Sequence, residues 1–138
     1  MPRILAIDYG KKRTGLAVTD PMQIISTALQ TVDTKDLIPF LKQYVEQNEV
    51  QVFVVGEQKQ LNNEPSASAN GANSLVNTLN KQFPHCTIQR IDERFTSSIA
   101  KQAILDSGVK KMKRQDKSLV DSVSAVLILQ TYLERISR

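Results

Sequence analysis

The stretch from Ile4 to Asp20 constrains the fold of this chain more than any other. A run of apolar residues, Ile4–Ile7, leads to Asp8, and a second apolar run begins at Leu16. Between the runs stand Gly10, three successive cations and Gly15, a pattern typical of a tight turn between two adjacent strands. Because every position of the first run is apolar, we expect that strand to be covered on both faces. Asp8 then lies at the end of a central strand, where an acid is costly unless something positive meets it.

Apolar periodicity predicts the elements that follow this hairpin. They are a third, antiparallel strand over 23–31, a helix ending near Asn48, a buried strand over 50–56, a helix over 72–83, a strand over 86–91, a short helix from 96 to 108, and a long helix over 118–136. Strands reached through a helical crossover lie parallel to the first strand. We therefore expect three parallel strands to end at one edge of the sheet.

Several residues have simpler structural interpretations. Thr34 or Asp36 is the expected N-cap of the first helix, in which Pro39 fits only within the first turn. Gly71 should weaken the first turns of the next helix. Cys86, the only cysteine, lies in an apolar segment and is expected to be buried rather than a nucleophile, and His85 is expected in a loop.

The predicted parallel edge gathers acids. Asp8, Glu57 and the pair Asp92-Glu93 follow the parallel strands, and Asp121 lies near the start of the last helix. Carboxylates drawn together hold Mg²⁺ or Mn²⁺ without needing His or Cys, and such ions support phosphodiester hydrolysis. Two questions stay open here. Asp92 and Glu93 point to opposite faces if the strand continues, and Ser118-Leu119-Val120-Asp121 has the spacing of a capping box.

Four stretches together resemble the YqgF (RuvX-like) family of the ribonuclease H-like superfamily. They are "AIDYGKKRTGLAVTD", "FVVGEQKQLNNEPSASA", "IDERFTSSIA" and "SLVDSVSAVLILQTYL", in the family's order and over nearly all of the chain. The resemblance implies an α/β fold with a mixed five-stranded sheet, formed by a three-stranded antiparallel meander and two parallel strands and flanked by helices. It also implies a metal-dependent nuclease whose catalytic and metal-binding residues are Asp8, Glu93 and Asp121, with Asp92 or Glu57 as alternative ligands.

The chain departs from the family pattern after the fourth strand. The family usually has Gly, an apolar residue and Pro, whereas this chain has Gly56-Glu57-Gln58. The shape of this loop is therefore open, and Glu57 adds a carboxylate.

Composition limits the class of protein. At 138 residues, with 41% hydrophobic and 23% charged residues, the chain suits one domain, which we expect to span 1–138. No apolar run approaches the roughly 18 residues of a membrane span, and the N-terminus lacks a signal-peptide pattern, so a cytoplasmic protein without membrane contact is expected. The net charge of +4 fits a polyanion partner but is weak evidence alone.

Cations beside the acids could hold phosphates. Lys11, Lys12 and Arg13 follow Asp8, and Arg94 follows the second acidic pair. A basic connector precedes the last helix and has a weaker case, since such connectors are often only solvated; its cations are Lys110, Lys111, Lys113 and Arg114. Tyr9 and Phe95 could stack on bases, although core packing is commoner.

These features support an endonuclease acting on structured nucleic acid. The resemblance favours processing of the 5′ end of pre-16S ribosomal RNA, with ribosomal precursor particles as partners and a monomer or homodimer as the active form. Resolution of branched DNA at Holliday junctions is one alternative, and a non-catalytic module for ribosome assembly is another. "IDYGKKRTG" also resembles the first phosphate loop of actin-like ATPases, but those enclose nucleotide between two domains, for which 138 residues are too few.

Overall fold

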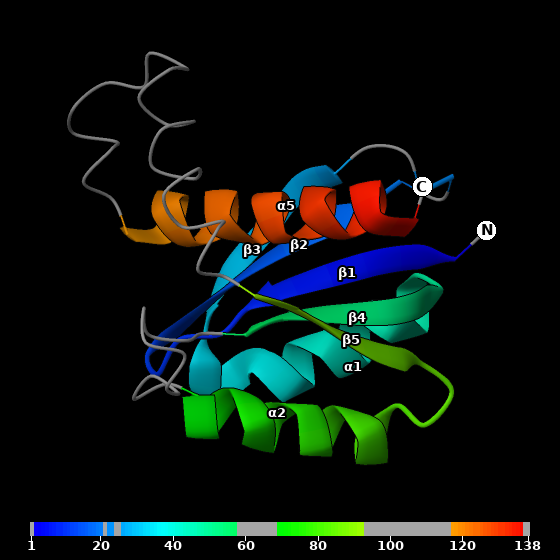
Figure 1. Ribbon diagram of the computed structural model, residues 1–138. Coiled ribbons are helices and arrows are strands. Elements are labelled where there is room, and N and C mark those ends of the chain that lie inside the picture. Colours follow the sequence, from blue (N-terminus) through cyan, green and yellow to red (C-terminus); the bar gives the residue numbers. More distant parts are fainter. Residues whose placement is uncertain (1, 21, 24–25, 58–68, 93–116, 137–138) are drawn as a thin grey trace.

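A five-stranded sheet forms the centre of the molecule (Figure 1). The computed structural model describes residues 2–20, 22–23, 26–57, 69–92 and 117–136. The strands are β1 (Arg3–Asp8), β2 (Arg13–Thr19), β3 (Ser26–Asp33), β4 (Val50–Glu57) and β5 (Thr87–Asp92). Their order in the sheet is β3-β2-β1-β4-β5.

The strand directions confirm the predicted mixture. β1 to β3 form an antiparallel meander, whereas β4 pairs in parallel with both β1 and β5. Ile7 is opposite Val55, and Glu57 is opposite Asp92. The three parallel strands therefore end together at one edge, called here the carboxyl edge.

Helices cover both faces of this sheet (Figure 1). The short 3₁₀ helix η1 (Thr34–Asp36), α1 (Leu37–Gln47) and α2 (Ala69–Gln82) lie on one face, and α5 (Lys117–Ile136) crosses the other. The predicted helix from 96 to 108 lies outside the described residues. Within the part of the chain that the structure describes, no helix is long and apolar enough to cross a membrane.

Alternation along the strands separates two hydrophobic clusters. On the α1/α2 face, Leu5, Ile7 and Phe53 pack with the apolar stripes of both helices. The cluster between the sheet and α5 has smaller side chains, since three of its buried members are alanines, two from the sheet and one from α5. This second cluster comprises Ile4, Ala6, Ala17, Val52, Val54, Ile91, Ala125, Ile128, Leu129 and Tyr132. Asp8 has the same parity as Ile4 and Ala6, which places it on the face that α5 covers.

The third strand begins later than the sequence indicated. β3 covers Ser26–Asp33 rather than 23–31. The preceding residues form a turn in which the Gln23 amide donates to the Asp20 carbonyl over 2.9 Å, and Gln23 has a φ of 60°. A register shift between Leu16 and Ala17 accommodates the extra residue of β3.

The start of α1 agrees with the predicted N-cap position, Asp36, but the Asp36 side chain makes no capping hydrogen bond. Thr34 lies in η1, and its hydroxyl donates to the Gly10 carbonyl 24 positions away in the chain instead of capping a helix. The expectations for Pro39, in the first turn, and for Asn48, the C-cap, are confirmed.

The structural expectation for Cys86 is confirmed. Its side chain is buried, and Sγ lies 3.2 Å from the Val50 carbonyl oxygen, to which it donates. Burial raises the pKa of this thiol, which keeps it protonated and poorly nucleophilic. His85 is exposed, as expected of a loop residue.

Gly71 has a packing role that its helix propensity does not indicate. A Cβ built at Gly71 would lie 2.6 Å from both Cε1 and the hydroxyl oxygen of Tyr9, so the bare backbone of α2 receives this ring. Tyr9 also packs against the cluster on the α1/α2 face. The residue after Asp8 is thus anchored to α2.

This contact predicts the sign of a substitution. Gly71→Ala should destabilise the protein by about 1–3 kcal/mol because the ring has to move, although alanine is the better helix former. Urea unfolding measures the change. The exposed Asn77→Ala variant in the same helix is the control and should unfold at the wild-type urea concentration or slightly above it. An unchanged or more stable Gly71→Ala protein would contradict the packing role.

Candidate functional site

Asp8 is the candidate whose position the structure describes best. It ends β1, is half-buried, and pairs with Gly15 of β2. The parallel register, in which Ile7 is opposite Val55, brings Gly56 of β4 beside it on the other strand. Both neighbours lack side chains, so glycines flank the Asp8 carboxylate across the sheet. The two neighbouring strands therefore place no side chain beside this carboxylate.

Glu57 and Asp92 share the carboxyl edge with Asp8. Their backbones are paired in register at the ends of β4 and β5. The structure describes the backbones of Glu57 and Asp92 but not their side chains. Glu93 follows Asp92 directly and lies outside the described residues, two positions after Ile91, which is buried in the cluster under α5.

Asp121 is brought to the same side of the molecule by α5. Figure 1 shows this helix beginning on the side of the sheet where β1 ends. Position 121 is one turn before Ala125, which is fully buried against the sheet. The side chain of Asp121 is not among those described, so the backbone gives its place on the helix and not its contacts.

Topology therefore brings Asp8, Glu57 and Asp92 to one edge of the sheet and the start of α5 to the same side. Among the side chains that the structure describes, no three from His, Cys, Asp and Glu lie close enough to hold a metal ion. Of the candidate ligands, Asp8 alone belongs to that set.

The three cations of the first turn take different places. Lys11 and Lys12 are exposed in the turn, whereas Arg13 is half-buried at the start of β2. Arg13 has the parity of Ala17, which packs under α5, so it lies on the same face of the sheet as Asp8. The other predicted cations, Arg94 and those of the connector from 110 to 114, lie outside the described residues.

Of the two roles predicted for Tyr9, core packing and base stacking, the structure supports core packing. Its ring packs on Gly71 and on the hydrophobic cluster, which favours core packing over base stacking. Phe95 lies outside the described residues.

Sequence reasoning missed the residues that hold the first turn in place. Thr14 is fully buried and its hydroxyl lies 2.9 Å from that of Thr34. The signal available in the sequence was a threonine, Thr14, in an otherwise apolar strand. That signal does not show that its partner, Thr34, comes from η1.

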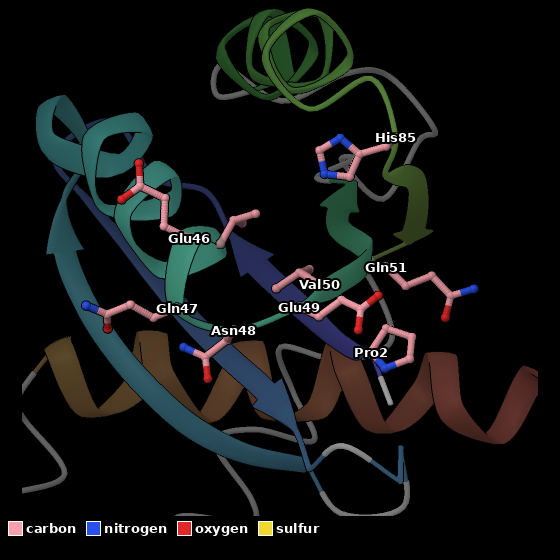
Figure 2. Close-up of a pocket in the computed structure, with 9 residues that line it drawn as sticks. Pro2, Glu46, Gln47, Asn48, Glu49, Val50, Gln51 and His85 are labelled. Atoms are coloured by element: carbon pink, nitrogen blue, oxygen red, sulfur yellow. The ribbon is translucent and has the colours of Figure 1, made fainter.

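A cavity of about 580 Å³ lies away from these residues, at the opposite edge of the sheet (Figure 2). The end of α1 and the starts of β1 and β4 form it, with Glu46, Glu49 and His85 among its polar side chains. In open α/β sheets, sites form beyond the carboxyl ends of the strands, so position favours the Asp8 edge over this cavity.

Comparison with known proteins assigns the family. A family model described as "RuvX: Holliday junction resolvase" matches residues 2–135. The chain belongs to the RuvX family. RuvX relatives include a protein of Flavobacterium johnsoniae that is 52% identical over 133 residues, covering 96% of each chain, and one of Phocaeicola vulgatus that is 53% identical over 134 residues, covering 97% of this chain and 96% of the relative. Both carry the name "Putative pre-16S rRNA nuclease".

Solved structures agree on the fold of this RuvX protein. The chain superimposes on RuvC of Thermus thermophilus in complex with a Holliday junction substrate with a TM-score of 0.61 and 16% identity, covering 99% of this chain and 96% of RuvC. A second RuvC structure from the same organism gives a TM-score of 0.56. The ribonuclease H-like fold is confirmed, and the family and its relatives confirm the expectation of a nuclease.

Proposed function

We propose that this protein is a divalent-metal-dependent endonuclease that processes the 5′ end of pre-16S ribosomal RNA. The single observation that carries the proposal is the place of Asp8, a half-buried carboxylate flanked by glycines at the carboxyl edge of a ribonuclease H-like sheet. The names of relatives about 50% identical to the chain support the substrate. The whole chain, 1–138, forms the nuclease domain and acts in the cytoplasm on ribosomal precursor particles, as a monomer or homodimer.

Carboxylate oxygens are the donors that suit Mg²⁺ or Mn²⁺, and the candidates at this edge are all carboxylates. Asp8, Glu93 and Asp121 would hold the ion, with Asp92 or Glu57 as alternatives. A bound ion supplies a water of lowered pKa and stabilises the departing oxyanion in phosphodiester hydrolysis. Asp8 contributes a ligand from a rigid central strand, and the adjacent glycines leave space for the ion and the scissile phosphate.

The place of Asp121 in α5 supports a ligand over a helix cap. A capping box requires Ser118 at the N-cap, just outside the helix. α5 begins at Lys117 and its first turn contains no acidic residue, so Asp121 belongs to the second turn. At that position a carboxylate cannot complete the reciprocal capping bonds.

The cations near Asp8 would contact phosphates of the nucleic acid. Arg13 lies on the Asp8 face, and Lys11 and Lys12 project from the exposed turn beside it. Positive charge here offsets the repulsion between a polyanion and the carboxylates. Arg94, Lys110, Lys111, Lys113 and Arg114 would extend this surface.

The proposal is tested by cleavage with the pure protein. A labelled RNA that spans the 5′ end of 16S ribosomal RNA and its leader, and a four-way DNA junction of matched length, are incubated with Mg²⁺, with Mn²⁺, or with EDTA. Metal-dependent cleavage of the RNA alone supports the proposal. Cleavage of the junction alone favours a resolvase, the second candidate, which the family description supports. Binding of either substrate without cleavage would identify a non-catalytic module.

The first turn predicts a change in salt dependence. Replacing Lys11, Lys12 and Arg13 together with Ala should weaken nucleic-acid binding and reduce the slope of log K against log salt by up to roughly 2.7 for duplex DNA, since each phosphate contact contributes about 0.9. Fluorescence anisotropy at several salt concentrations measures this slope.

A matched control separates local contact from net charge. Lys42, Lys81 and Arg135 are exposed in α1, α2 and α5, and replacing them with Ala removes the same charge. This control should keep most of the wild-type slope. Equal slopes for the two triple variants would show that the turn makes no phosphate contact.

A further inference from the structure

Three hydrogen bonds fix the turn between β1 and β2 to the start of the first helical segment. Thr34 Oγ1 donates to the Gly10 carbonyl oxygen over 2.5 Å, and the Thr34 amide donates to the Lys12 carbonyl oxygen over 2.9 Å. Thr34 thus binds the cationic turn at two carbonyls, those of Gly10 and Lys12, although it is not part of the hairpin.

The direction of the remaining hydrogen bond follows from proton counting. The hydroxyls of Thr14 and Thr34 are 2.9 Å apart. A hydroxyl has one proton, and that of Thr34 is used at Gly10, whose carbonyl can only accept. Thr14 is therefore the donor to Thr34. Because Thr14 is fully buried, removal of the Thr34 oxygen would leave its hydroxyl without this acceptor.

The turn itself has little freedom to take another shape. A Cβ built at Gly10 would collide with the Arg13 carbonyl oxygen, so the backbone folds back closely on itself at this point. The hydroxyl chain from Thr14 through Thr34 to Gly10 holds this close approach from the α1/α2 face. Asp8 and Arg13 stand at the two ends of the segment that it holds.

We propose that Thr34 is a positioning residue for nucleic-acid binding, which it serves by holding the cationic turn at Gly10 to Arg13 in a fixed place beside Asp8. The role rests on the proposed function, because it concerns how Lys11, Lys12 and Arg13 meet phosphates. Preorganised cations bind without the entropy cost of ordering the turn. Thr34 acts through the backbone of the turn and does not itself contact the substrate.

Thr34→Val tests this role by removing the hydroxyl while keeping the shape of the side chain and the amide bond to Lys12. The backbone amide of residue 34, which donates to the Lys12 carbonyl, should exchange with deuterium at least about fivefold faster relative to its intrinsic rate than in the wild type, measured by mass spectrometry. Affinity for the RNA and junction probes should fall roughly tenfold, with an unchanged salt slope because all the cations remain. Thr34→Ser keeps the hydroxyl and should restore both properties.

Thr131→Val is the matched control, since Thr131 Oγ1 is also partly buried and donates to a backbone carbonyl, that of Leu127, over 2.8 Å. It should leave exchange of the residue-34 amide and affinity unchanged. Wild-type exchange of the residue-34 amide in Thr34→Val would overturn the proposal. If Thr34→Val does not fold, Thr14→Val, which removes the donor to Thr34, must show the faster exchange. Wild-type exchange in Thr14→Val would then overturn the proposal.

The exchange measurement needs no nucleic acid, so it separates the two proposals. Faster exchange in Thr34→Val together with no binding of either probe by the wild type would refute the proposed function and leave the anchoring of the turn intact. Faster exchange with undiminished affinity in Thr34→Val would overturn the positioning role.

Discussion

Asp8→Asn should lower the single-turnover rate of cleavage by at least ~10³-fold in saturating Mg²⁺. Asparagine keeps the size of the side chain but removes the charge that holds the ion, and the ion contributes several kcal/mol of transition-state stabilisation. Binding of the RNA should be retained or become tighter, because a negative charge beside the phosphates is lost. A labelled RNA followed by quenched-flow gel analysis gives the rate, and anisotropy gives the affinity.

Glu46→Gln is the appropriate control for this substitution. Glu46 is exposed near the end of α1, beside the cavity at the opposite edge of the sheet, so an equal change of charge occurs away from the carboxyl edge. Its cleavage rate should match the wild type. Wild-type cleavage by Asp8→Asn would remove Asp8 from the site.

The second large effect is stabilisation by the metal ion. A ligand present at 100 times its Kd stabilises the folded state by about 2.7 kcal/mol, which for a chain of this size raises the melting temperature by roughly 5–10 °C. Mg²⁺ or Mn²⁺ should therefore raise the melting temperature of the wild type, measured by calorimetry against EDTA. Asp8→Asn and Asp121→Asn should abolish this response and leave the metal-free protein as stable or more so, because repulsion between the carboxylates is relieved.

The alternative role of Asp121 predicts a different outcome. If Asp121 only caps α5, Asp121→Ala should lose roughly 0.5–2 kcal/mol of stability, whereas Asp121→Asn can still cap, and both variants should keep the metal response. Glu57 would then take its place in the site. In the proposed site, Glu93→Gln loses the metal response and cleaves more slowly. Glu57→Gln keeps the metal response and the wild-type rate of cleavage.

The fold was largely predictable because its signals are local. Apolar runs such as Ile4–Ile7 and Val52–Val55 identify strands buried on both faces, and the crossover rule then places their ends at one edge. The start of β3 was missed because the turn after Asp20 uses backbone hydrogen bonds and a positive φ at Gln23, for which a glutamine gives no signal.

The partners of individual side chains were less predictable. The cap expected of Thr34 is a local interaction, whereas its actual partners, Gly10 and Thr14, come from the first hairpin. In the same way, helix propensity describes Gly71 as a weak point of α2 and cannot anticipate the Tyr9 ring that occupies the space beside it. Both contacts are tertiary, and local preference does not encode them.

The three alanines between α5 and the sheet link metal selectivity to the hydrophobic core. Ala6, Ala17 and Ala125 are fully buried, and their small volume lets the helix lie close to the sheet. In the proposed site Asp8 comes from the sheet and Asp121 from the helix, so the spacing of these two ligands depends on the packing between them. Mg²⁺ requires ligand distances of about 2.0–2.1 Å, whereas larger ions accept longer ones. Replacement of one alanine by valine would therefore widen the site and change which ion it prefers, with every ligand still in place.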